Sequence, residues 1–475
     1  MTKKRTTLTF YGGVNEIGGN KILLEDGDTR VFLDFGMSFG KRGLYYEEFL
    51  NPRSANGIGD FLEMNLVPNI EGLYREDLLK TAGLKTREPN IDGVFLTHAH
   101  ADHSNYISFL HEKIPIYVGE TAYLILNAIA ESGTRDIESE IIDFKKRPLI
   151  DRKVQPLKRV FKCFRTRDKI KIGSLEIEPI HVDHSVPGAY GFIVHTSRGA
   201  VIYTGDLRMH GTKPEMTRDF IEHAKETKPT ALIIEGTRID EEHDPRTEND
   251  VKDECEGYIS KTNRIVIADF NFKDVDRFKT FFEIAKNQNR KLVVSLKDAF
   301  LLKWLSQDMK LNVSPPTDEN LAIYIPKRGT GRYIESDYNK RERQFLNLEN
   351  AWTAKEVKKK QNHIILVLSF FGMSELIDVK PDAIGLFIHS LSEPFNEEME
   401  IDYRRLRNWL LHFQLQMIQS HCSGHVCRKE LIDIATTISP KVIFPIHTEH
   451  SHLFRELFKN MHVKLALEGK PIEIA

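Results

Sequence analysis

The sequence predicts an α/β protein in which stacked β-sheets are flanked by helices and a second α/β region follows. Two observations support this prediction. Short β-branched runs alternate with turn residues over the first 240 positions, and strand and helix patterns alternate regularly after that point. The chain has 475 residues, 40% of them hydrophobic and 29% charged, which is typical of a globular protein. This length corresponds to about two to four domains.

The first part of the chain is rich in short strands. Most of them lie next to Gly, Pro or Asp, and helical patterns, such as residues 120–132, lie between some of them. The expected strands cover residues 8–11, 21–24, 30–34, 93–97, 116–118, 175–179, 191–194, 200–203 and 231–234. Many strands with few helices indicate stacked sheets with helices on their outer faces.

From about residue 240 the pattern changes to a βαβ alternation, which is expected for a parallel sheet. The elements predicted there are strands 264–268 and 291–295, helices 274–288, 298–307 and 403–419, and a final helix 428–437 with strand 441–445. The change of pattern indicates a separate region in the second half of the chain.

Charge, cysteine content and hydropathy indicate the cellular compartment and the classes of partner. The chain has 67 Lys+Arg and 69 Asp+Glu, and a net charge of −2 neither favours nor excludes a nucleic-acid partner. Four cysteines are too few for a disulfide scaffold and indicate a reducing compartment. The sequence starts without an apolar secretory segment, and its longest apolar run, residues 364–373, is shorter than the ~20 residues of a membrane helix. We expect a cytoplasmic protein with no membrane partner.

The strongest chemical signal follows the strand at 93–97. Three histidines and one aspartate, His98, His100, Asp102 and His103, occur within six positions. Side chains at a strand end can point at one space, and neutral imidazoles and carboxylates suit Zn²⁺. The sequence therefore predicts a metal site here.

Three further positions occur in a fixed order around this motif. Asp34 closes an early strand, His184 precedes Ser185 and Pro187, and Asp206 closes a later strand. Together with the His-rich motif they resemble the signature of the metallo-β-lactamase fold, an αββα sandwich. The resemblance implies the following assignment: His98, His100 and His184 on one metal, Asp102 and His103 on a second, Asp206 between them, and Asp34 supporting the ligand histidines. His181 is an alternative to His184, but the Ser-x-Pro that follows favours His184.

The C-terminal motifs are similar to those of the β-CASP nucleases, and within that family most like the archaeal form of ribonuclease J. The similar segments are residues 11–20, 233–238, 420–425 and 444–449, and the short segment after His447 contrasts with the extra domain of bacterial members. The family inserts a β-CASP α/β domain into the metallo-β-lactamase domain. We therefore divide the chain into residues 1–240, the insert 241–415 and the returning segment 416–475. Residues 392–397 depart from the Pro-Gly-Asn-Glu-like turn of the family.

The resemblance also implies the chemistry. His447 adds a ligand to the second metal and, as a histidine at this motif, favours RNA over DNA. His425, held charged by Glu235, acts as the general acid beside the scissile phosphate. Asp102 and Asp34 complete the catalytic set, and Ser423 and Gly424, with His425, contact the phosphate.

The resemblance implies two Zn²⁺ per chain, with Mn²⁺ as the alternative, and a bridging hydroxide that hydrolyses RNA. The predicted function is a 5′-to-3′ exoribonuclease, with endonuclease activity in addition, that prefers single-stranded RNA with a 5′-monophosphate and works as a homodimer in RNA decay or processing. The alternatives are a DNA or structure-specific β-CASP nuclease, a small-molecule metallo-hydrolase, and an inactive RNA-binding scaffold. Residues 145–171 hold 12 Lys+Arg and 2 Asp with interleaved Phe161 and Phe164, which is consistent with an RNA-tracking surface or with a solvated charged segment.

Overall fold

The computed structural model describes all residues except 1–4, 48, 134–135, 148–154, 395–396 and 475. The chain forms two compact units. The first consists of Met1–Met209, Lys213–Asp244 and Gly424–Ala475, and the second of His210–Thr212 and Pro245–Ser423.

The described residues of the first unit form two large sheets. One has seven strands in the order β22 (Ile472–Ile474), β1 (Thr6–Phe10), β2 (Lys21–Asp26), β3 (Thr29–Phe35), β4 (Gly93–Leu96), β5 (Ile116–Gly119) and β8 (Phe161–Phe164). The other has six, in the order β21 (Ile443–Ile446), β13 (Ala231–Glu235), β12 (Gly199–Tyr203), β11 (Tyr190–Thr196), β10 (Leu175–His181) and β9 (Ile170–Ile172). Each expected strand of the first 240 residues has a counterpart here, and the ends differ by at most two residues.

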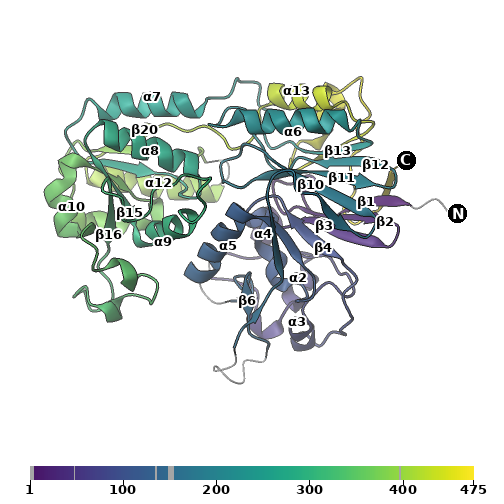
Figure 1. Ribbon diagram of the computed structural model, residues 1–475. Coiled ribbons are helices and arrows are strands. Elements are labelled where there is room, and N and C mark those ends of the chain that lie inside the picture. The colour runs from purple at the N-terminus through teal and green to yellow at the C-terminus, as the bar shows by residue number, and fades with distance from the viewer. Residues whose placement is uncertain (1–4, 48, 134–135, 148–154, 395–396, 475) are drawn as a thin grey trace. The chain divides into compact units, whose positions relative to one another are not determined.

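The core of the first unit lies between its two sheets. Phe10 and Phe95 from one sheet and Phe192, Ile233 and Phe444 from the other belong to one cluster of buried side chains. The helices α6 (Pro214–Glu226) and α13 (Arg428–Ile438) lie side by side over the six-stranded sheet, and α4 (Ala101–Ser104) and α5 (Glu120–Ser132) pack on the seven-stranded sheet (Figure 1). This αββα arrangement confirms the predicted fold class.

The second unit is built on one parallel sheet. Its order is β17 (Ala351–Thr353), β16 (Leu321–Ile325), β15 (Lys291–Ser295), β18 (Ile364–Val367), β14 (Val266–Asp269), β19 (Leu386–His389) and β20 (Gln416–Gln419), and every neighbouring pair is parallel. The longer helices are α7 (Glu248–Ile259), α8 (Val275–Asn287), α9 (Leu296–Leu305), α10 (Ala354–Lys360) and α12 (Glu397–His412). The βαβ alternation expected from the sequence is therefore present.

Shorter elements complete the two units. They are α1 (Phe39–Gly43), α2 (Gly59–Glu63), α3 (Glu76–Thr81), α11 (Leu376–Val379), α14 (Ser451–Leu457) and the pair β6 (Asp143–Phe144) and β7 (Leu157–Lys158). In the described part of the chain, 3₁₀ turns lie at Ser54–Asn56, Asn105–Phe109, Glu335–Asp337, Arg343–Phe345, Gln361–His363 and Phe370–Glu375.

The helix expected over residues 403–419 is wrong at its C-terminal end. The helix α12 ends at His412, and Gln414 adopts a left-handed backbone with φ 53° that breaks the helical path. Residues Gln416–Gln419 then pair with β19 as strand β20. Pairing at the edge of a sheet is a tertiary effect, and helix periodicity does not reveal it. The strand β20 belongs to the second unit, which ends at Ser423 rather than at 415.

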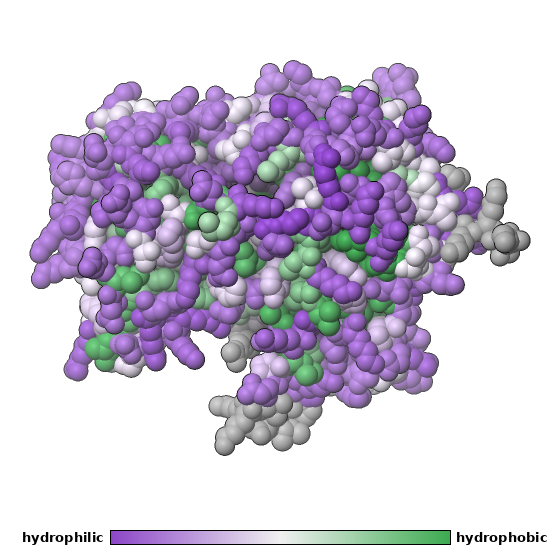
Figure 2. All heavy atoms as spheres, in the orientation of Figure 1, coloured by the Kyte–Doolittle hydropathy of each residue, from purple (hydrophilic) through white to green (hydrophobic). Residues whose placement is uncertain are grey.

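The surface visible in Figure 2 is mostly hydrophilic, with apolar side chains in small separate areas. Among the described residues, no helix has both the length and the apolar character needed to cross a membrane.

Candidate metal centre

The candidate site residues follow strand ends that meet at one edge of each sheet. Asp206, Glu235 and His447 lie at or just beyond the C-terminal ends of β12, β13 and β21, which are parallel neighbours. Asp34 lies near the end of β3, and His98 follows β4, its parallel neighbour. Since parallel strands bring their carboxyl ends to one edge, residues far apart in sequence converge there.

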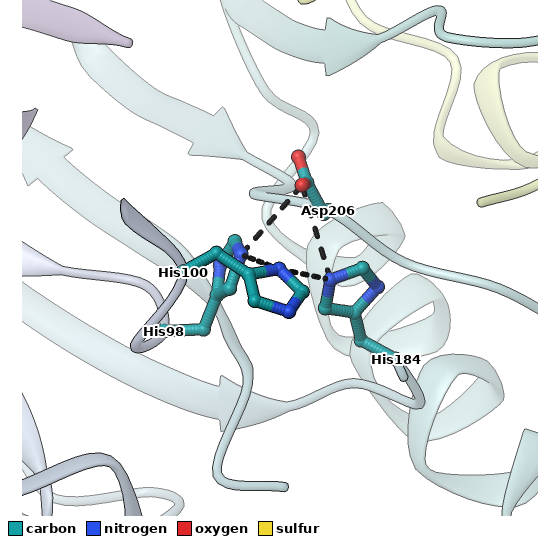
Figure 3. A group of neighbouring side chains, drawn as sticks. All are labelled: His98, His100, His184 and Asp206. Carbon is teal, nitrogen blue, oxygen red and sulfur yellow. Dashed lines mark hydrogen bonds and ion pairs between the residues drawn. The ribbon is translucent and has the colours of Figure 1, made fainter. Parts of the chain in front are cut away.

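A first group of ligand atoms comes from His98, His100, His184 and Asp206, which point toward one another in Figure 3. The Nδ1 atom of His100 lies 3.1 Å from Nε2 of His98 and 3.2 Å from Nε2 of His184. Asp206 Oδ2 lies 3.6 Å from His98 Nε2 and 3.9 Å from His184 Nε2. Two nitrogen ligands of a tetrahedral zinc, each about 2.0–2.1 Å from the ion, are about 3.3 Å apart. The spacing of the three imidazoles therefore fits a shared metal.

The outer ring nitrogens of this group have partners that turn the inner nitrogens toward the centre. His184 Nδ1 donates to the carbonyl oxygen of Gly424 at 2.7 Å, and His98 Nδ1 lies 3.0 Å from the hydroxyl of Thr97. Burial, and then the neighbouring histidines, hold the pKa of His98 and of His184 well below the usual range. Both rings are therefore neutral, as metal ligands must be.

A second group consists of Asp102, His103, Asp206 and His447. His103 Nε2 lies 3.2 Å from Asp206 Oδ2, and His447 Nε2 lies 3.2 Å from Asp102 Oδ2 and 3.6 Å from Asp206 Oδ2. Within the described residues, the buried atoms His103 Nε2 and Asp206 Oδ1 have no hydrogen-bond partner. A buried ring nitrogen and a buried carboxylate oxygen without hydrogen-bond partners fit a divalent cation, which would replace a proton on His103.

Carboxylates dominate the electrostatics of this second group. Burial lowers the pKa of His103, but Asp206, Asp34 and Asp102 raise it more, so that it lies well above the usual range. Burial raises the pKa of Asp206, yet His103 and His447 hold it well below the usual range. Asp206 belongs to both groups and is the carboxylate they share.

Asp34 orients the site from behind. Its Oδ2 atom accepts hydrogen bonds from His103 Nδ1 at 2.7 Å, Thr97 Oγ1 at 2.8 Å and Tyr203 OH at 2.6 Å, and its Oδ1 atom accepts one from the Thr97 backbone N–H at 2.7 Å. Such bonds fix which nitrogen of His103 faces the centre. Thr97 and Tyr203 were not among the predicted site residues. The position of Thr97, directly before the His-rich motif, is the signal that could have found it.

His425 and Glu235 form a pair beside both groups. His425 Nδ1 lies 2.9 Å from Glu235 Oε2, and the other oxygen of Glu235 accepts the backbone N–H of Leu207 at 2.9 Å. The His425 ring centroid is 5.3 Å from that of His184 and 5.5 Å from that of His447. Burial lowers the pKa of His425, but Glu235 raises it more, to about 9. His425 is therefore an imidazolium at neutral pH.

Gly424 and Ser423, which we expect to contact the phosphate, both make hydrogen bonds to histidines through their carbonyl oxygens. Gly424 contacts His184 through its carbonyl oxygen, so its observed role is to support a ligand histidine. Ser423 is the last residue of the second unit, and its carbonyl oxygen accepts a hydrogen bond from His210. Contact of Ser423 and Gly424 with phosphate stays a prediction. His181 stacks on Tyr190, with ring centroids 4.1 Å apart, and is not a member of either group.

The basic segment 145–171 is largely occupied by internal interactions. Ion pairs join Lys146 to Glu112, Arg147 to Glu140, Arg165 to Glu120, Arg167 to Asp219 and Lys171 to Glu176. Arg159 is buried and donates to the backbone carbonyls of Ser108 and Leu110. Arg152 and Lys153 lie outside the described residues. The described part of the segment therefore favours a structural role over an open RNA-tracking surface.

Comparison with known proteins agrees with this geometry. Residues 70–247 match the model of the Beta-lactamase superfamily domain, and residues 411–467 match that of the Zn-dependent metallo-hydrolase RNA specificity domain. Together the two matches support the predicted resemblance to the β-CASP nucleases. The two matched segments lie before and after most of the second unit in the sequence. They contain His98, His184, Asp206, His425 and His447. The matched Zn-dependent domain and the groups of candidate ligands support a metal cofactor.

The similarity to known proteins extends over nearly the whole length of the chain. It is 22% identical to Ribonuclease J of Helicobacter pylori over 96% of its own chain and 58% of that protein, and 21% identical to Ribonuclease J of Mycoplasma genitalium over 94% and 68%. The chain thus spans less than two thirds of the length of the Helicobacter relative. A protein of unknown function from Enterococcus faecalis has a similar crystal structure, with 25% identity, a TM-score of 0.75 and coverage of 99% of this chain and 100% of that one.

Proposed function

We propose that this protein is a metal-dependent ribonuclease that removes nucleotides from single-stranded RNA in the 5′-to-3′ direction, with endonuclease activity in addition, and prefers a 5′-monophosphate end. The protein would bind two metal ions, Zn²⁺ or Mn²⁺, for this reaction. The observation that carries the proposal is the His425–Glu235 pair beside the two ligand groups. The RNA specificity domain matched by residues 411–467 and the names of the relatives support RNA as the substrate.

Each metal would be held by one of the two ligand groups, with Asp206 common to both. When bound, the metals would supply an activated water and neutralise charge on the phosphate. The chain's own residues supply the rest. The imidazolium of His425 donates a proton to the leaving oxygen, and Glu235 Oε2, 2.9 Å away, keeps that proton on the ring before the reaction. A hydrolase of small esters with a good leaving group has less need of such a pair.

The preference for a 5′-monophosphate rests on family resemblance and on the position of Ser423 and Gly424 directly before His425. A cytoplasmic location and a homodimer stay predictions.

The direct test follows single-stranded RNA labelled at its 3′ end through time. Substrates with a 5′-monophosphate, a 5′-hydroxyl and a 5′-triphosphate are compared, together with single-stranded DNA of the same sequence. The variant His425→Ala and added EDTA are the negative controls. The matched control is His452→Ala, which removes an exposed histidine of α14.

We expect stepwise shortening of the 5′-monophosphate RNA, which both negative controls abolish and the matched control leaves unchanged. Internal cuts that do not depend on the 5′ group would replace the exonuclease proposal with an endonuclease. Cleavage of DNA but not RNA would favour the DNA-nuclease alternative. Protein that binds metal and cleaves neither nucleic acid would favour a small-molecule hydrolase, and protein that neither binds metal nor cleaves would favour the RNA-binding scaffold.

A further inference from the structure

The hydroxyl of Thr237 lies at the junction of three site residues that come from distant parts of the chain. Thr237 follows β13, and its side chain is half-buried. Its Oγ1 atom lies 2.7 Å from Glu235 Oε2, 2.9 Å from His447 Nδ1 and 3.2 Å from His425 Nδ1. A single hydroxyl therefore contacts both site histidines, His425 and His447, that follow the second unit in the chain.

Counting the protons at this junction decides which group donates. A hydroxyl has one hydrogen and two lone pairs, and an ionised carboxylate only accepts. The hydrogen of Thr237 goes to Glu235 Oε2, because this is the shortest contact and the carboxylate cannot donate. The lone pairs of Oγ1 are then left for the imidazoles, so His447 Nδ1 must carry its hydrogen to make the 2.9 Å bond.

The other nitrogen of His447 faces the metal centre. With the hydrogen on Nδ1, a neutral His447 has its lone pair on Nε2, which lies 3.2 Å from Asp102 Oδ2 and 3.6 Å from Asp206 Oδ2. We infer that Thr237 is a positioning residue whose hydroxyl fixes the tautomer and orientation of His447, so that Nε2 is available to the second metal. This inference rests on the two-metal part of the proposed function.

The inference predicts a different effect on the affinity of each of the two metals. No hydrogen bond in the described part of the chain joins Thr237 to His98, His100 or His184, the three histidines of the first group. Removing the hydroxyl should therefore weaken one metal and leave the other. Partners that orient a ligand histidine typically account for about 10–100-fold in metal affinity.

The test measures zinc binding by the full-length protein after its metals have been removed. Zinc is titrated against a chromophoric chelator, which yields the dissociation constants of both ions, and bound zinc is counted by elemental analysis. Thr237→Val removes the hydroxyl at nearly constant shape, and Thr237→Ser keeps it. The matched control is Thr230→Val, at the other end of β13, whose hydroxyl donates to the backbone carbonyl of Ala200. If Thr237→Val does not fold, Thr237→Ala removes the same hydroxyl.

We expect Thr237→Val to weaken one zinc about 10–100-fold while the other keeps its affinity. Thr237→Ser and Thr230→Val should bind both ions like the wild type. The inference would be overturned if Thr237→Val bound zinc like the wild type or bound both ions equally weakly. It would also be overturned if Thr237→Ser were as defective as Thr237→Val, or if the wild type bound a single zinc. A wild type that binds two zinc ions but does not cleave RNA would refute the proposed function and leave the inference standing.

Discussion

Replacing Glu235 by Gln should slow RNA cleavage, and the loss of rate should grow as the pH rises. The carboxylate of Glu235 lies 2.9 Å from His425 Nδ1 and raises the pKa of His425 to about 9 against the opposing effect of burial. The glutamine has nearly the same shape and can still accept the backbone N–H of Leu207, but it has no charge. We expect the pKa of His425 to fall to its ordinary value of about 6.5 or below.

The magnitude follows from the fraction of His425 that is protonated. At pH 8 about 0.9 of the wild-type side chain carries the proton, against about 0.03 of a histidine with pKa 6.5, so cleavage should fall roughly 30-fold. At pH 6 the two fractions are about 1.0 and 0.75, and the loss should be less than about twofold. Because the acid form is the active one, the defect grows as pH rises. The change of about 2.5 pKa units corresponds to roughly 3 kcal/mol.

The assay is the initial rate of cleavage of single-stranded RNA between pH 6 and pH 9, under single-turnover conditions. His425→Ala provides the reference, since it removes the acid at every pH, and Glu235→Gln added to it should have no further effect. Glu430→Gln, which alters a carboxylate that caps α13, is the matched control. An equal loss at pH 6 and pH 8 would refute the argument that Glu235 acts through the charge of His425.

Three further predictions concern metal binding and stability. Asp34→Asn should lower zinc affinity about 10–100-fold, because an amide cannot accept all the bonds that the carboxylate accepts. Competition with a chelator measures this, and Asp26→Asn, a buried carboxylate that accepts from Thr6 and Ser197, should bind zinc normally. Zinc at 100 times its dissociation constant should stabilise the protein by about 2.7 kcal/mol per bound ion, which would be measured as a higher Tm than in EDTA. The variant His98→Ala should show a smaller increase in Tm. An unchanged Tm of the wild type would contradict metal binding. Lys21 is fully buried, and burial lowers its pKa to about 8, below its value of 10.5 in the unfolded chain. The unfolded chain therefore binds more protons between pH 8 and 10.5, so wild-type stability rises across this window. Lys21→Met should stabilise the protein by up to about 3 kcal/mol at pH 7, an advantage that shrinks above pH 8 in urea unfolding; a constant difference would contradict the assignment.

The sequence predicts which candidate metal ligands lie together better than it predicts their surroundings. His98, His100 and His103 are close in sequence, so chain geometry alone brings them near one another. The strands of the first unit are short β-branched runs bounded by turn residues, and these local signals are sufficient to locate them.

Contacts that depend on the fold are not visible in the sequence. The environment of Thr237 brings together Glu235, His425 and His447, and nothing local to residue 237 indicates that its hydroxyl meets residues 425 and 447. The basic segment 145–171 has the composition of an RNA surface, yet its acidic partners lie at Glu112, Glu120 and Asp219, outside the segment. Ion pairs with residues elsewhere in the chain neutralise part of the positive charge of the segment, and composition does not reveal such pairs.

The pairing of β21 with β13 joins segments about 200 residues apart in the chain, with Pro245–Ser423 of the second unit between them. His425 and His447 are therefore among the last site residues to leave the ribosome during synthesis. Until they have emerged, a nascent chain would have the proposed ligands of the first metal but neither the proposed general acid nor all the proposed ligands of the second metal. The proposed nuclease would be inert toward its own messenger RNA while that message is being translated, and any chain interrupted within the second unit would be inert for the same reason.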